Sequence, residues 1–123
     1  MPDTKAVILC VDDEEIPRML RCLILVKQGY EVIKAGSGKE ALQLLESKEF
    51  DLVLTDQMMP GMTGTELTKA VKAKRPNMPV IIISGMNELP ADASLADRFI
   101  SKIEGPEALF DGVATALEKY QGQ

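Results

Sequence analysis

The chain has 123 residues, with 14 Lys and Arg against 19 Asp and Glu, and therefore a formal net charge of −5. This length fits one domain, and a composition of 46% hydrophobic and 27% charged residues excludes intrinsic disorder. Scattered cations argue against nucleic acid as a partner, and the absence of a long apolar run or signal-peptide pattern predicts a cytoplasmic protein without membrane contact.

Five short segments have the composition of strands. Three are continuous apolar runs, which is typical of strands that are covered on both faces of a parallel sheet. The second and fifth segments have a weaker strand pattern, and we expect them nearer to the edges of the sheet. In chain order the predicted strands are residues 6–11, 30–35, 52–54, 80–83 and 98–102.

Helical periodicity appears between these strands. Apolar residues recur at spacings of three and four in three segments, namely Ile16, Met19, Leu20, Leu23 and Ile24; Leu67, Ala70 and Val71; and Leu109, Val113, Ala116, Leu117 and Tyr120. The pairs Ser37 with Glu40 and Thr63 with Glu66 have capping-box spacing, Pro17 and Pro106 suit first helical turns, and Gly29 suits a helix C-terminus.

The alternation of strands and helices predicts a fold of the α/β class. Short connections between five strands indicate a doubly wound parallel sheet with helices on both faces and right-handed crossovers. The 123 residues are expected to form this one domain without a further output domain. In such sheets, ligands bind beyond the carboxyl ends of the strands, so functional residues are expected there.

Polar residues follow four of the predicted strands: Asp12 and Asp13, Asp56, Ser84, and Lys102. Each has a structural explanation when taken alone, such as helix capping or a solvated surface charge. Together, however, a parallel sheet would bring three carboxylates, a hydroxyl and an ammonium to one edge. Close carboxylates repel by roughly 4 kcal/mol per pair at an effective dielectric near 20, so the cluster requires a cation. The chain has no His, and hard oxygen ligands favour Mg²⁺.

The two cysteines carry no predicted function. Cys10 and Cys22 lie in apolar patterns without the Cys-x-x-Cys spacing of a redox or zinc site. We expect both to be buried, reduced thiols.

Two motifs and two single positions resemble the receiver domain of two-component response regulators, of the chemotaxis-regulator kind. They are Val-Asp-Asp-Glu at residues 11–14, Asp-Gln-Met-Met-Pro-Gly-Met-Thr-Gly at 56–64, Ser84 followed by Gly85, and Lys102 preceded by Phe99. The resemblance covers nearly the whole chain and implies the flavodoxin-like strand order 2-1-3-4-5.

The resemblance also implies roles for individual residues. Asp56 would accept the phosphoryl group, Asp13 would bind Mg²⁺ directly, and Asp12 would act partly through water, with the backbone carbonyl of Met58 as a further ligand. Ser84 and Lys102 would hold phosphoryl oxygens. Ser84 and Phe99 would form the conformational switch, although Phe99 also fits as an ordinary core side chain.

One half of the domain departs from this family. Only 102 − 84 = 18 positions separate Ser84 from Lys102, about one helical turn fewer than is usual, and Pro90 interrupts the segment. The helix before the last strand is therefore expected to be short. The family usually has a proline after its lysine, joined by a cis bond, but Ile103 follows here. A cis bond before Ile103 would cost about 2.5–4 kcal/mol, so we predict a trans bond.

The function implied is a phosphorylation-operated switch in a phosphorelay. A histidine kinase or phosphotransfer protein would donate the phosphoryl group to Asp56 in a Mg²⁺-dependent reaction, and a downstream protein would recognise the altered surface. This is self-modification, including autodephosphorylation, rather than turnover of an external substrate. The chain would be a stand-alone regulator or a receiver from a longer protein.

Three alternatives remain open from the sequence. A receiver that has lost its switch would bind partners constitutively, which the altered segment 86–106 suggests. A Mg²⁺ phosphohydrolase of the haloacid-dehalogenase type would need an Asp-x-Asp motif, which Asp13-Glu14-Glu15 does not supply. A flavin carrier is disfavoured because residues 12–15 would repel a phosphate.

Overall fold

The structure is a computed structural model that describes residues 5–85 and 96–121, with side chains described up to residue 118. Its five parallel strands are β1 (Val7–Val11), β2 (Glu31–Ala35), β3 (Leu52–Asp56), β4 (Val80–Ser84) and β5 (Arg98–Ser101). They form one sheet in the order β2-β1-β3-β4-β5, which confirms the predicted strands and their order.

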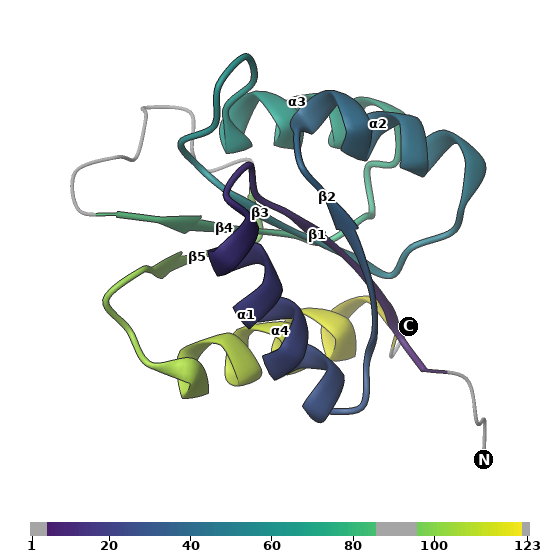
Figure 1. Ribbon diagram of the computed structural model, residues 1–123. Coiled ribbons are helices and arrows are strands. Elements are labelled where there is room, and N and C mark those ends of the chain that lie inside the picture. Colours follow the sequence, from purple (N-terminus) through teal and green to yellow (C-terminus); the bar gives the residue numbers. More distant parts are fainter. Residues whose placement is uncertain (1–4, 86–95, 122–123) are drawn as a thin grey trace.

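Four helices cover the two faces of the sheet within the described residues: α1 (Glu15–Lys27), α2 (Gly38–Ser47), α3 (Gly64–Lys74) and α4 (Pro106–Gln121). Figure 1 shows α2 and α3 on one face and α1 and α4 on the other. The expected short helix before β5 falls on residues 86–95 and lies outside the described residues. No described helix has both the length and the apolar character needed to cross a bilayer.

Alternate residues of the strands enter two separate cores. Leu9, Val53 and Ile82 pack with Leu67 and Val71 beneath α2 and α3. On the other face, the core contains strand and α4 side chains together with Leu25 of α1; its buried members are Ile8, Cys10, Leu25, Leu52, Leu54, Ile81, Ile83, Ile100, Leu109, Val113, Ala116 and Leu117. Both faces of the central strands are thus buried, as their continuous apolar runs predict.

The helix termini follow most of the predicted signals. Thr63 and Glu66 form a complete capping box, and Gly29 follows α1 with a φ of 96°, which suits glycine. Ser37 caps α2 by accepting a hydrogen bond from the Glu40 amide. The Glu40 carboxylate accepts from the Gly36 amide instead, so only half of that predicted box forms.

The orientation of α1 differs from the one that its periodicity suggests. Four of its five predicted apolar residues face outward: Ile16, Met19, Leu20 and Leu23, with Val26, form an apolar stripe and are between 45% and 66% exposed. The fifth, Ile24, packs against the core beneath α1 and α4. The opposite side of the helix, with Arg18, Arg21 and the buried Leu25, faces the sheet. Both arginines donate hydrogen bonds to Asp12 at the end of β1, Arg18 to its backbone carbonyl and Arg21 to its carboxylate.

The cysteine prediction is correct in part. Both thiols are free, but only Cys10 is buried, and Cys22 is half-buried on α1. Burial raises the pKa of the Cys10 thiol to about 12. Cys10 is therefore a core side chain without reactive character at neutral pH.

Candidate functional site

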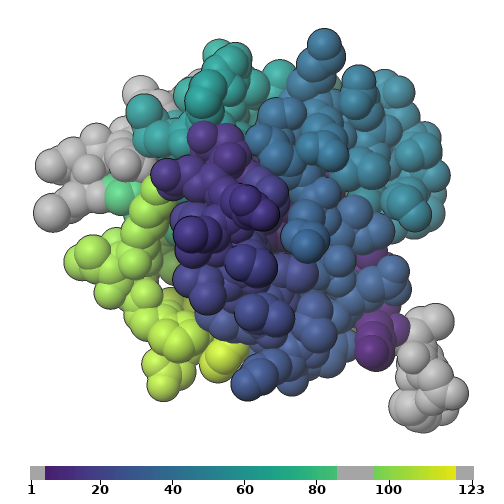
Figure 2. All heavy atoms as spheres, viewed as in Figure 1, coloured from purple at the N-terminus to yellow at the C-terminus, as the bar shows by residue number. Residues whose placement is uncertain are grey.

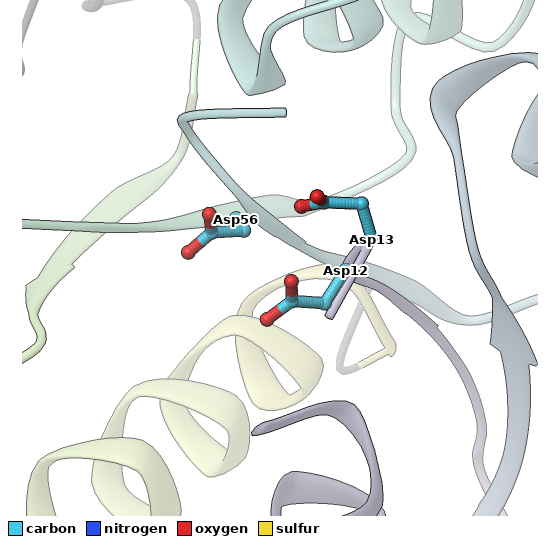
Figure 3. A group of neighbouring side chains, drawn as sticks. All are labelled: Asp12, Asp13 and Asp56. Atoms are coloured by element: carbon cyan, nitrogen blue, oxygen red, sulfur yellow. The ribbon is translucent and has the colours of Figure 1, made fainter. Parts of the chain in front are cut away.

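Three aspartates meet where β1 and β3 end. Asp12 and Asp13 directly follow β1, and Asp56 is the last residue of β3. Figure 3 shows the three side chains gathered at this edge of the sheet. One carboxylate oxygen from each lies within 4.8 Å of those of the other two, a spacing that allows a shared metal ion.

The three carboxylates have different surroundings. Asp56 and Asp12 are buried, whereas Asp13 is exposed. Asp13 makes no hydrogen bond or ion pair with the described part of the chain, so its carboxylate is available to a ligand. Asp12 accepts a hydrogen bond from the Glu14 amide at 3.0 Å, which holds the turn between β1 and α1.

Two cations approach the buried carboxylates. Lys102, the residue after β5, places Nζ 3.0 Å from Oδ1 of Asp56. Arg21 of α1 places Nη1 2.6 Å from Oδ2 of Asp12 and Nη2 3.8 Å from Oδ1 of Asp56. Asp56 is therefore a desolvated carboxylate facing one ammonium and, at longer range, one guanidinium.

Ser84 lies beside this group at the end of β4. In the pairing of β3 with β4, Asp56 stands opposite Ile83, so Ser84 is one position further along. The Ser84 side chain is buried, and its backbone carbonyl accepts a hydrogen bond from the Lys102 amide at 2.9 Å. The sheet thus brings five of the predicted site residues to one edge: Asp12 and Asp13 after β1, Asp56 at the end of β3, Ser84 at the end of β4 and Lys102 after β5.

The remaining predicted residues lie at the margin of the site. Phe99 of β5 is half-buried and packs against the core beneath α2 and α3. Met58 has a side chain that is 55% exposed, which leaves its backbone as the group that could serve a ligand. The peptide bond between Lys102 and Ile103 is trans, as predicted.

The loop after β3 is held by a buried amide side chain. Oε1 of Gln57 accepts hydrogen bonds from the backbone amide and the hydroxyl of Thr65, at 3.0 and 2.9 Å. The Gly64 amide donates to the Gln57 carbonyl at 2.9 Å. These bonds dock the first turn of α3 against the end of β3 and thereby fix the backbone of Asp56.

Sequence reasoning missed Arg21 and Gln57. The sequence carried one signal for Arg21: it lies two or three turns after the acidic pair, on the side of α1 opposite the apolar stripe. Nothing in the residue pattern indicates that this polar side faces the sheet.

The pKa of the Asp56 carboxyl is raised above its ordinary value. Burial is the largest cause, and the neighbouring Asp12 charge adds to it, while Lys102 and Arg21 act in the opposite direction. The folded state therefore binds the Asp56 proton more tightly than the unfolded state does. The contribution of Asp56 to stability is therefore present below the ordinary aspartate pKa and is lost as the pH rises through the raised one.

This linkage predicts a stabilising substitution. In metal-free buffer at pH 7, Asp56→Asn is expected to raise the free energy of unfolding by about 1 kcal/mol, because it removes a desolvated charge. The gain should shrink as the pH falls below the folded-state pKa and disappear near pH 3. Urea denaturation of both proteins between pH 3 and pH 7 measures it, with Glu14→Gln as the exposed control. A gain that does not vary with pH would contradict this assignment.

Known proteins that are similar to the chain in sequence and fold identify the family. The family described as "Response regulator receiver domain" matches residues 8–114. The transcriptional regulatory protein GlrR of Escherichia coli K12 is 35% identical over 97% of the chain, which spans 28% of GlrR. Sporulation initiation phosphotransferase F of Bacillus subtilis is 39% identical over 67% of the chain and 66% of its own length.

Solved structures agree with this match. The response regulator protein TrrA of Thermotoga maritima, solved in complex with Mg²⁺-BeF, has a TM-score of 0.85 and 31% identity and covers 90% of this chain and 98% of its own. A receiver domain protein from Clostridium thermocellum has a TM-score of 0.87, 29% identity, and coverage of 94% and 97%. The chain belongs to the response regulator receiver domains, the phosphorylation-based signalling switches of two-component systems.

Proposed function

We propose that Asp56 is the phosphoacceptor of this receiver domain. The observation that carries the proposal is the placement of one buried carboxylate within reach of two further aspartates and 3.0 Å from the Lys102 ammonium. An oxygen of Asp56 attacks the phosphorus of a phosphohistidine. The new O–P bond forms as the P–N bond breaks, and the electron pair stays on the imidazole nitrogen.

The donor set fits a hard divalent cation. Asp12, Asp13 and Asp56, with the backbone carbonyl of Met58, would hold Mg²⁺, whose bound charge would offset the negative charge that develops on the phosphoryl oxygens. The family relationship supports this choice, since TrrA was solved with Mg²⁺-BeF. Lys102 pairs with a phosphoryl oxygen, and the Ser84 hydroxyl donates a hydrogen bond to another.

The surface of α1 supports a protein as the phosphoryl donor. The exposed apolar stripe of Ile16, Met19, Leu20, Leu23 and Val26 begins two residues after the Asp13–Glu14 turn and runs along the helix. Figure 2 shows α1 on the surface of the molecule, at the front of this view. A helical domain of a histidine kinase or phosphotransfer protein would bury this stripe while it presents its phosphohistidine to Asp56.

The chain acts on itself rather than on an external substrate. Attack of water on the phosphorus restores the Asp56 carboxylate and releases inorganic phosphate. We expect the phosphorylated state to be recognised by a downstream protein, with Ser84 and Phe99 carrying the change to the surface near β5. We propose that residues 1–123 are one receiver domain, whether the chain acts alone or within a longer protein.

Intact-protein mass after incubation with Mg²⁺ and acetyl phosphate tests this function. A single phosphoryl adduct is expected on the wild type and none on Asp56→Asn, with amide shifts near Ser84 and Phe99 in the phosphorylated protein. An adduct without those shifts would favour a receiver that does not switch, and the absence of an adduct would contradict the assignment of Asp56.

A further inference from the structure

Arg21 occupies a place among the carboxylates that a divalent cation would use. Its guanidinium lies 2.6 Å from Asp12 and 3.8 Å from Asp56, and both carboxylates are buried, with side chains only 2% and 3% exposed. A contact of 2.6 Å between a guanidinium and a carboxylate is a charge-assisted hydrogen bond, which is stronger than a neutral one. The arginine is itself 15% exposed, so solvent screens this pair only weakly.

The charges of the cluster explain why the arginine is held there. Three carboxylates carry a charge of −3, and Lys102 and Arg21 together supply +2. Without Arg21, Asp12 would be a buried carboxylate whose only bonds come from backbone. The guanidinium thus provides part of the charge compensation that a bound metal ion would otherwise supply.

We propose that Arg21 is an internal competitor of the divalent cation, bound to Asp12 when the metal is absent and released from Asp12 when the metal binds. This inference rests on the proposed function, because it assumes that the cation binds among the same aspartates. Arg21 is a positioning residue, since it acts on the metal through Asp12.

The structure offers room for the released side chain. A hollow of about 210 Å³ adjoins the site and is lined by Arg21, Lys102 and Glu104, among others. The Glu104 carboxylate accepts a hydrogen bond from the Ser101 amide at 2.8 Å, which keeps it beside this hollow. A guanidinium that leaves Asp12 therefore has a second carboxylate within the same region.

Arg18 provides a matched control on the same helix. Its Nη1 donates to the backbone carbonyl of Asp12 at 2.7 Å, and no ion pair joins it to a carboxylate of the cluster. Arg18→Gln and Arg21→Gln remove the same charge from neighbouring turns of α1. Only the second change removes a cation bound to a carboxylate that the metal needs.

Calorimetric titration with Mg²⁺ of the wild type and both variants tests the proposal. Arg21→Gln is expected to bind Mg²⁺ about tenfold more tightly than the wild type, while Arg18→Gln stays within about twofold. Equal or weaker binding by Arg21→Gln, beside measurable binding by the wild type, would overturn the proposal and leave the proposed function intact. Failure of all three proteins to bind Mg²⁺ would overturn both.

A second measurement uses the wild type and does not depend on the folding of a variant. A guanidinium held by a carboxylate rotates slowly, so the Nη protons of Arg21 are expected to give separate NMR signals without metal. Saturating Mg²⁺ should shift or merge the Arg21 signals and leave those of Arg18 unchanged. If the Arg21 signals keep their metal-free positions at saturation, the arginine is not released from Asp12 and the proposal is wrong.

Discussion

Asp13→Asn is expected to lower the rate of Mg²⁺-dependent phosphorylation by about a hundredfold. Asp12 is bound by Arg21 and Asp56 by Lys102, but Asp13 is exposed and has no partner in the described ranges. A cation can therefore bind Asp13 without displacing a cation of the protein. Loss of this carboxylate should weaken Mg²⁺ binding and slow adduct formation together, and both are measured by following intact mass across a Mg²⁺ series.

Glu14→Gln is the control for this prediction. Glu14 adjoins Asp13 and is exposed, and its contact with the cluster is a hydrogen bond from its backbone amide to Asp12, which the substitution retains. It therefore changes the net charge equally without removing a proposed ligand. Equal rate losses in the two variants would mean that overall charge, and not the Asp13 carboxylate, controls phosphorylation.

Much of the fold and the site follows from the sequence because parallel sheets impose strong rules. Continuous apolar runs identify the central strands, and the carboxyl ends of parallel strands must meet at one edge. These two rules were sufficient to predict that Asp12, Asp13 and Asp56 gather together. They also place Lys102 near them, which its 3.0 Å contact with Asp56 confirms.

The orientation of α1 could not be predicted in the same way. An apolar periodicity shows which side chains share a face of a helix, but the sheet and its charged groups decide which face is buried. Here Ile16, Met19 and Leu20 are exposed, while Arg18 and Arg21 on the opposite side bind Asp12. The polar contacts of this face are a hydrogen bond from Arg18 to the Asp12 backbone carbonyl and one from Arg21 to the Asp12 carboxylate, which no hydrophobic pattern records.

The backbone of Asp56 lies in close contact with Gly64, eight residues later in the chain. A Cβ added to Gly64 would lie 2.5 Å from the Asp56 carbonyl oxygen and 3.0 Å from Cα of Gln57. Both are backbone atoms, so a side chain at this position forces β3 and α3 apart instead of rotating away. Alanine has a higher helix propensity than glycine, which by itself would stabilise α3. The crowding is expected to outweigh this gain.

Gly64→Ala is therefore expected to lower the free energy of unfolding by about 2–3 kcal/mol and to slow phosphorylation by displacing Asp56. Urea denaturation and the rate of adduct formation measure the two effects. Gly36→Ala is the matched control, since its added Cβ would lie at an ordinary 3.6 Å from the side chains of Arg18 and Glu40. Similar free energies of unfolding for the two variants would show that α3 and the loop after Asp56 can move apart without destabilising the fold. In that case the close docking of Gly64 would not be what holds the phosphoacceptor in position.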